Sequence, residues 1–211
     1  MKQKNIYIIR HGETALNKKK WVQGSGVDSR LNELGQAQAH AFYSTYGHVK
    51  FDRVFTSKLI RTHESVQSFI DDSIPWVQLW GLNEISWGDK EGRKLTAKDD
   101  QQYFDMIKAW NNGDYTQKSP GGESPLEVAE RQQKAWEYIM SYEEDENILV
   151  CMHGRAIRIL LCGLLRVPMS EMDIFKHQNL CLYQLSYTNG LYKIEKENDT
   201  SHLASLFSEA H

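Results

Sequence analysis

The fold of this 211-residue chain is decided by the stretch IYIIRHG, residues 6–12. Four apolar residues in a row are typical of a short strand that is covered on both faces, as in a parallel sheet. Arg10 and His11 follow directly, and Gly12 then lets the backbone turn sharply and approach a ligand closely. We therefore expect a buried strand over residues 6–9 that carries polar side chains at its carboxyl end.

A second stretch has the same arrangement. In NILVCM, residues 147–152, the five residues after Asn147 are apolar and run into His153 and Gly154. Ligands of open parallel sheets bind outside the carboxyl ends of the strands, and the N-terminus of a following helix favours an anion. A single histidine at such a position is a structural residue about as often as a functional one. Here the pattern occurs twice, and in one case an arginine precedes the histidine. We therefore expect His11 and His153 to share one pocket with Arg10.

Strands and helices alternate along the rest of the chain. We expect further strands over residues 53–56 and 75–79, and a hairpin of residues 182–187 and 191–194 around Asn189-Gly190. Helices are expected from residue 33 behind the N-cap Asn32, over 59–70, 97–110, 125–142 behind a capping box at Ser124, and 154–165. The tail after Lys196 is expected to be poorly ordered. The alternation predicts an α/β layered domain.

The segment from about residue 80 to 122 departs from this alternation. It is rich in Gly, Asp, Lys and aromatic residues, and we expect it to form a small cap insertion over a site, within a single domain of residues 1–211. Its aromatic side chains either line the pocket or only pack against neighbouring side chains. Packing is the more common role. Lys90, Arg93 and Lys94 either meet a second anionic group or form a solvated charged face, which is the usual placement.

Composition restricts the class of protein. The hydrophobic share of 40% and charged share of 25% are ordinary for a soluble globular protein, and the net charge of −3 argues against a nucleic-acid binder. The longest apolar stretch, residues 156–165, is too short to span a bilayer, and the N-terminus has no signal-peptide core. Three cysteines without paired spacing indicate reduced thiols. We expect a cytoplasmic monomer or homodimer without membrane or nucleic-acid partners.

The motifs together resemble those of the histidine phosphatase superfamily, the phosphoglycerate-mutase-like enzymes. The matching stretches, in chain order, are RHGET at 10–14, Asn17, QG at 23–24, GQA at 35–37, TSKLIR at 56–61, LNE at 82–84 with WG at 87–88, PGGES at 120–124, HG at 153–154 and Asn179. They cover residues 6 to about 185. The resemblance implies a three-layer α/β/α sandwich with a mostly parallel central sheet and the small cap insertion.

The resemblance also implies roles for site residues. His11 is then the nucleophile that forms a phosphohistidine, and Arg10 and Arg61 hold down its protonation and bind the phosphoryl group. Without the resemblance, Arg61 would pass for an ordinary arginine on a helix surface. His153, either protonated or donating one N–H, completes the cluster, and Glu84 is the general acid for the leaving alkoxide. The substrate-binding residues of this pattern are Asn17, Gln23, Gly24 and Gly154. No metal or cofactor is implied, and the partner is a small phosphorylated substrate.

The superfamily contains both hydrolases and mutases. The sequence after Glu84, ISWGDKEG, resembles the "G.WEG" pattern of the phosphatases more than the "GGLxGLNK" stretch of the cofactor-dependent mutases. The paired arginines of the mutases are missing, and the chain is shorter than most of them. We therefore predict a phosphomonoesterase for small phosphorylated metabolites, with a cofactor-dependent phosphoglycerate mutase as the alternative. The basic residues 18–20 and Arg30 depart from the family pattern and affect substrate contacts.

Two other classes of protein remain as alternatives. A metallohydrolase would also use His11, His153 and Glu84, but the chain has no HExxH or similar ligand spacing. A non-catalytic module that binds phosphorylated ligands would keep Arg10 and Arg61 without needing His11 or Glu84. Because all the matched catalytic positions are intact, the sequence favours an enzyme.

Overall fold

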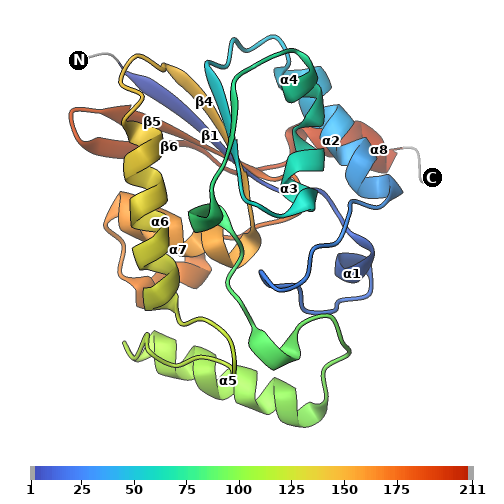
Figure 1. Cartoon of the computed structure of the whole chain (residues 1–211), viewed down its shortest axis with the longest axis vertical. Coiled ribbons are helices and arrows are strands. Elements are labelled where there is room, and N and C mark those ends of the chain that lie inside the picture. Colours follow the sequence, from blue (N-terminus) through green and yellow to red (C-terminus); the bar gives the residue numbers. More distant parts are fainter. Residues whose placement is uncertain (1–2, 209–211) are drawn as a thin grey trace.

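The computed structural model describes residues 3–208, and its centre is one six-stranded sheet (Figure 1). The strand order is β3-β2-β4-β1-β5-β6, in which the first four strands are parallel, β5 runs antiparallel to β1, and β6 runs antiparallel to β5. The strands are β1 Lys4–Arg10, β2 Arg53–Thr56, β3 Trp76–Gln78, β4 Asn147–Met152, β5 Leu182–Thr188 and β6 Leu191–Asp199. The expected mostly parallel sheet is confirmed.

Helices cover both faces of this sheet, so the expected three-layer α/β/α sandwich is confirmed (Figure 1). The α-helices are α1 Ala15–Lys18, α2 Glu33–Tyr46, α3 Ile60–Ser65, α4 Gln67–Asp71, α5 Ala97–Asn111, α6 Pro125–Met140, α7 Gly154–Leu165 and α8 Ala204–Ser208. Short 3-10 turns are η1 Trp80–Leu82, η2 Gly88–Lys90, η3 Met169–Ile174 and η4 Ser201–Leu203. In residues 3–208, no helix combines the length and the apolar character that a bilayer crossing requires.

Strand β1 shows why the sequence has a continuous apolar run. Ile6 and Ile8 point to the core beneath α6 and α7, whereas Tyr7 and Ile9 point to the core beneath α2 and α4. The three isoleucines have no exposed surface, and Tyr7 keeps only 8%. Alternate residues of this strand therefore pack into two different cores, one on each face of the sheet. A strand with one exposed face would instead alternate apolar and polar residues.

The expected helix over residues 59–70 is two short helices. Val66 lies between α3 and α4 with φ −123° and ψ 15°, outside the helical region. In the last turn of α3, the Ser65 hydroxyl donates to the carbonyl of Arg61 at 2.6 Å and accepts the N–H of Gly12 at 2.9 Å. A serine bonded back to the preceding turn bends a helix, and here it also ties α3 to the loop after β1.

The expectation of a poorly ordered tail after Lys196 is wrong for residues 197–208. Strand β6 continues to Asp199, and the chain then forms η4 and α8. Leu203 is 3% exposed in the core under α2, and the His202 ring packs edge-on against Phe42 with its Nε2 2.8 Å from the carbonyl of Leu180. These buried contacts fix the tail. Residues 209–211 lie outside the described part of the chain.

The cap segment, residues 80–122, begins inside the core and then leaves it. Leu82 and Ile85 are completely buried in the same core as α6 and α7. Helix α5 lies apart from the sheet at one end of the molecule, joined to it by extended chain (Figure 1). Its buried face carries Met106 and Trp110, and Tyr103 accepts a hydrogen bond from Arg155 of α7 at 2.9 Å. The cap segment therefore begins in the core and ends in a helix, α5, which side-chain contacts hold over the end of the sheet.

Candidate active site

The two histidines after the strands lie side by side. Arg10 and Met152, the last residues of the parallel strands β1 and β4, are paired in register, so that His11 and His153 leave the sheet at the same edge. Their ring centroids are 5.1 Å apart. The predicted meeting of the two strand ends is confirmed.

A cavity of about 570 Å³ opens at this edge. Five predicted site residues, which we call the reactive set, line it: Arg10, His11, Asn17, Gln23 and Glu84. The rest of the lining, which we call the cap wall, consists of Val22, Trp87, Lys90, Leu95, Asp100, Tyr103 and Phe104. Arg61, His153, Gly24 and Gly154 do not line the cavity and lie buried behind it. Five of the nine predicted site residues therefore border one cavity, and the other four lie behind it.

His11 has the form that a nucleophile requires. Its Nδ1 lies 2.7 Å from the carbonyl oxygen of Gly12, and because a carbonyl only accepts, Nδ1 carries the proton. Nε2 then carries the free lone pair. Burial is the main cause that lowers the pKa of His11 well below its usual value of 6.5, and the charges of Arg61 and Arg10 lower it further. The expected effect of the two cations is present, but burial is the larger cause.

Arg61 is completely buried, which excludes the helix-surface alternative. Its guanidinium donates to the carbonyls of Val27 at 2.7 Å and Gly24 at 3.0 Å, while Nε has no partner in residues 3–208. Burial lowers its pKa to about 10, opposed chiefly by the charge of Glu84. Arg61 therefore remains a cation at neutral pH.

His153 is held by a residue of the TSKLIR stretch to which the motif assigned no role. Its Nε2 lies 2.8 Å from the hydroxyl of Ser57, which directly follows β2. Nδ1 is buried and has no hydrogen-bond partner in the described chain. Burial, followed by the charge of Arg61, lowers the pKa of His153 well below 6.5. Of the two predicted forms, the protein's own groups favour the neutral one and disfavour the protonated one.

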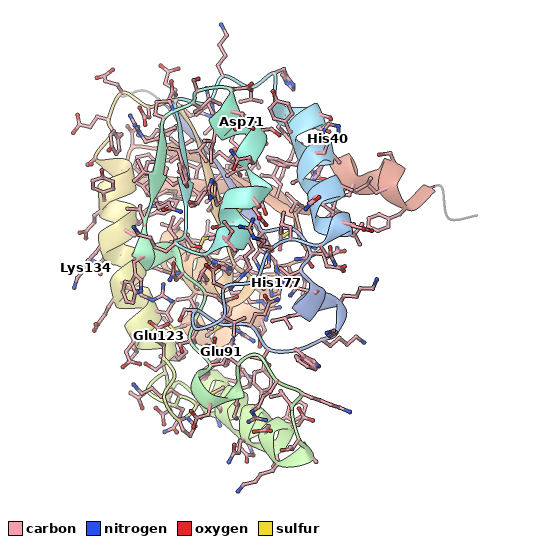
Figure 2. The ribbon with its side chains drawn as sticks, turned by 45° about the vertical axis from the view of Figure 1, so that its right-hand side comes forward. His40, Asp71, Glu91, Glu123, Lys134 and His177 are labelled. Atoms are coloured by element: carbon pink, nitrogen blue, oxygen red, sulfur yellow. The ribbon has the colours of Figure 1, made fainter. Side chains whose placement is uncertain are left out.

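Arg10 is oriented by His177, another residue that the motifs did not indicate. Arg10 Nη1 lies 3.3 Å from His177 Nδ1, and Arg10 Nε has no partner in the described chain. Burial lowers the pKa of His177 to about 3, and the charge of Arg10 adds to this, so the ring is neutral and accepts the guanidinium N–H. Figure 2 shows His177 in the centre of the molecule, between the sheet layers and the cap segment.

Asn17 and Gln23 are held by the short helix α1. The side-chain oxygen of Asn17 accepts from the backbone N–H of Thr14 at 3.1 Å and from Asn179 at 3.3 Å. Asn17 borders the cavity, and its Nδ2 donates to no group in residues 3–208. Gln23 donates to the Thr14 hydroxyl at 2.7 Å. Asn17 therefore presents a neutral donor to the cavity, as expected.

Glu84 is anchored at the N-terminus of α7. Its Oε1 accepts from the N–H of Ile85 at 3.0 Å and of Ala156 at 2.9 Å, and its Oε2 accepts from the N–H of Arg155 at 3.1 Å. The free N–H groups expected to favour a bound anion are therefore used by a carboxylate of the protein itself. Gly154 begins this helix, and a Cβ there would lie 2.6 Å from the ring of His177.

Glu91 joins two walls of the cavity, although the ISWGDKEG stretch that contains it assigned it no role. Its carboxylate accepts from the N–H of Gly26 at 2.8 Å and from the N–H of Trp87 at 2.7 Å. A Cβ on Gly24 would lie 2.1 Å from Glu91 Oε1 and 2.5 Å from the backbone carbonyl oxygen of Ile85, and because that carbonyl cannot swing aside, only glycine fits where this loop meets the cap segment. The loop that supplies carbonyls to Arg61 is therefore fixed by the cap segment.

Comparison with known proteins identifies the pattern. The family model of the histidine phosphatase superfamily (branch 1) matches residues 6–200. A probable phosphoglycerate mutase of Erwinia tasmaniensis is 28% identical over 207 residues, which cover 94% of each chain. Within residues 3–208, no group of three or more His, Cys, Asp or Glu side chains is arranged to hold a metal ion.

Solved structures of phosphatases share the fold. The α-ribazole phosphatase from Shigella flexneri superposes with a TM-score of 0.80 at 25% identity, over 92% of this chain and 96% of its own. A mycobacterial glucosyl-3-phosphoglycerate phosphatase superposes with a TM-score of 0.80 at 23% identity, over 94% of this chain and all of its own. The latter likeness concerns the fold alone.

Proposed function

Because the chain belongs to the histidine phosphatase superfamily, a group of phosphoryl-transfer enzymes, we propose that it hydrolyses small phosphomonoesters through a phosphohistidine on His11. One observation carries this proposal: the Nδ1–H of His11 is bound to the carbonyl of Gly12, which leaves the Nε2 lone pair for attack. The lowered pKa of His11 keeps this lone pair available at neutral pH.

In the first step, Nε2 of His11 attacks phosphorus and the bond from phosphorus to the ester oxygen breaks. The cation of Arg10 and the amide of Asn17 line the cavity and bind the phosphoryl oxygens. The charge of Arg61 and the free Nδ1 of His153, both buried behind the cavity, add to the stabilisation of the charge that spreads over the equatorial oxygens. Two guanidinium nitrogens, Nε of Arg10 and Nε of Arg61, are buried without partners in residues 3–208, which supports a site built for an anion.

Glu84 serves both steps. Protonated, it gives its proton to the leaving alkoxide, which departs as an alcohol. As a carboxylate, it then takes a proton from the water that attacks the phosphohistidine, and phosphate leaves with His11 neutral again. The three backbone N–H groups around Glu84 hold its carboxyl group at the cavity that it shares with His11.

We further propose that the reaction needs no metal ion. The tasks that a metal would perform, neutralising phosphate charge and polarising phosphorus, fall here to Arg10 and Arg61. Hydrolysis should therefore continue at an unchanged rate in EDTA. A rate that falls with EDTA and returns with a divalent cation would contradict metal independence.

The test is release of phosphate from an aryl phosphate in EDTA, with the wild type, His11→Ala and a matched control, His40→Ala. His40 is exposed on the outer side of α2, away from the cavity (Figure 2). We expect His11→Ala to lose activity on the order of 10³-fold or more and His40→Ala to keep it. Full activity in His11→Ala would end the phosphohistidine mechanism. Quenched wild type should carry radiolabelled phosphate that is stable in base and lost in acid.

A phosphoglycerate mutase is the second candidate, favoured by the name of the Erwinia relative at 28% identity. A mutase returns the phosphoryl group to a second hydroxyl instead of water, so it needs a phosphorylated enzyme and a retained intermediate. Incubation of 3-phosphoglycerate with 2,3-bisphosphoglycerate separates the two functions. We expect inorganic phosphate to form without 2-phosphoglycerate, and rapid appearance of 2-phosphoglycerate would favour the mutase.

We also propose a cytoplasmic enzyme that acts as a monomer or homodimer on a small phosphorylated substrate, without nucleic-acid or membrane partners. The three cysteines are buried free thiols, which suits a reducing compartment. Light scattering at micromolar concentration distinguishes monomer from homodimer, and a larger assembly would contradict this proposal.

A further inference from the structure

The cap wall takes no part in the phosphoryl-transfer steps. Helix α5, with the loop before it and Val22, brings this surface over the carboxyl ends of β1 and β4 (Figure 1). When His11 attacks a phosphomonoester, the alcohol part of that ester extends within the same cavity, so the cap wall is the surface that meets the leaving alcohol.

Three aromatic rings form a connected surface on this wall. The Trp87 and Tyr103 ring centroids lie 5.8 Å apart, and those of Tyr103 and Phe104 lie 6.1 Å apart. Phe104 is 65% exposed although it is among the large apolar side chains of the molecule. Tyr103 is fixed by the hydrogen bond from Arg155. An exposed aromatic surface inside a cavity is suited to cover a flat apolar group, because ring contacts add to the free energy of burial.

Lys90 is a buried cation on the same wall. It is 5% exposed, and its ammonium makes one contact in the described chain, 3.5 Å from the carbonyl oxygen of Asp99. The Asp99 carboxylate is occupied by Arg93, with two bonds of 2.8 and 2.9 Å. Asp100 also borders the cavity but is exposed and forms no ion pair with Lys90 in residues 3–208. A buried ammonium is normally paired, so Lys90 is available to a ligand anion.

Arg93 and Lys94 differ from Lys90. Arg93 is bound to Asp99, and Lys94 is exposed, so both have the usual surface placement. Of the three cations in this stretch, Lys90 alone borders the cavity. The second anionic group that the sequence left open therefore has one candidate partner.

We propose that the cap wall is a leaving-group site for an aromatic alcohol that carries a second anionic oxygen group. The ring lies against Trp87, Tyr103 and Phe104, and Lys90 donates to the anionic group. This inference rests on the proposed phosphatase function, since it assigns the substrate class of that activity. The anionic group is a carboxylate or a second phosphate, which offer Lys90 the same oxygen acceptors.

Three esters of primary alcohols test the substrate class, because their scissile bonds are alike and their alcohol parts differ. They are glycerol 1-phosphate, benzyl phosphate and 4-carboxybenzyl phosphate. The probe for a second phosphate is 4-phosphonobenzyl phosphate, because its C–P bond is not hydrolysed. We expect kcat/KM to rise about tenfold from the glycerol to the benzyl ester. It should rise about tenfold again when the ring carries an anionic group.

Variants assign the two steps to the named side chains. Lys90→Met keeps a similar volume and should remove the tenfold gain of the carboxylated ester while leaving benzyl phosphate within about twofold. Unchanged turnover of benzyl phosphate also shows that this variant folds. Phe104→Ser should reduce the preference for benzyl over glycerol phosphate by about three- to tenfold. Leu191→Ser is its control, because Leu191 is equally exposed at 63% and lies on the β5–β6 hairpin.

The outcomes separate this inference from the proposed function. If none of the esters is hydrolysed, the phosphatase function itself fails. If all are hydrolysed at similar rates, or if Lys90→Met slows the benzyl and carboxybenzyl esters equally, the function stands and the leaving-group site is overturned.

Discussion

The reactive set and the cap wall border one cavity but are built differently. Members of the reactive set leave the ends of sheet strands or are held by backbone groups, as His11 is by Gly12 and Glu84 by three N–H groups. The cap wall consists of side chains from helix α5, from the loop before it and of Val22, all outside the sheet, and it includes the exposed Phe104. Chemistry that requires fixed geometry is therefore placed on the sheet, whereas the surface that meets the variable alcohol is placed on an insertion.

This contrast has a measurable consequence. A change in the reactive set should slow the hydrolysis of every phosphomonoester, because all of them share the phosphoryl group. A change in the cap wall should alter the order of preference among esters and leave the rate of a minimal substrate nearly unchanged. The experiments below begin with the largest expected effect.

Glu84→Gln should lower kcat for alkyl phosphates by about 10²–10⁴-fold, because the leaving alkoxide loses its proton donor. For 4-nitrophenyl phosphate the loss of rate in the step that forms the phosphohistidine should be far smaller, since nitrophenolate leaves without protonation. The measurement is a burst experiment with both esters. Equal losses for the two esters would mean that Glu84 only holds the structure, and Glu91 or another acid would then need consideration.

His177→Phe should lower kcat/KM about tenfold for all esters alike, because Arg10 loses the ring nitrogen that orients it. His177→Gln, which retains an acceptor, should recover part of this loss. The comparison uses benzyl and glycerol phosphates in parallel. A loss confined to one ester would place His177 with the cap wall instead of the reactive set.

Acid should weaken the fold through the site's histidines. The folded-state pKa values of His11, His153 and His177 lie below the ordinary value of 6.5, so the folded protein keeps the rings neutral while the unfolded chain protonates them. Their contribution is fully present above pH 6.5 and is lost as the pH falls below it. As the pH falls, each of these three histidines lowers the free energy of unfolding by up to about 1.4 kcal/mol per pH unit.

Urea unfolding between pH 7 and pH 5 measures this slope. The variant His11→Asn should have a shallower slope than the wild type, whereas the cap-wall variant Phe104→Ser should keep the wild-type slope. A slope identical in the wild type and His11→Asn would show that His11 is protonated in the folded protein.

Tyr103→Phe should have the smallest effect. It removes the hydrogen bond from Arg155 but keeps the ring, so we expect a loss of about 1 kcal/mol in the free energy of unfolding. The preference for benzyl over glycerol phosphate should change by less than about threefold. Thermal unfolding and the same two esters measure both effects. A large change in glycerol phosphate turnover would show that the cap wall supports the reactive set.

Much of the fold followed from local sequence. The capping box at Ser124, the N-cap at Asn32 and the apolar run at 147–152 fix their elements through interactions within a few residues. The break at Val66 and the ordered tail did not follow, because they depend on contacts with Gly12 and α2 from distant parts of the chain. The periodicity of apolar residues along the chain does not indicate such long-range contacts.

The site divides in the same way. His11, His153, Arg61 and Glu84 stand in motifs, so resemblance locates them without coordinates. Ser57 and Glu91 stand in matched stretches and His177 stands outside them. Their roles depend on hydrogen bonds to groups 65 or more residues away, and a motif does not specify a partner that only folding brings close.

Sequence alone determined the alternating strands and helices, the two histidines at strand ends and the family that this pattern identifies. Tertiary structure alone decided that Arg61 and His153 lie behind the cavity and that Lys90, one of three cations in its stretch, borders it. The physical reason is that a motif specifies residue types along the chain, whereas burial, pKa and the freedom of a charge depend on neighbours brought together by the fold.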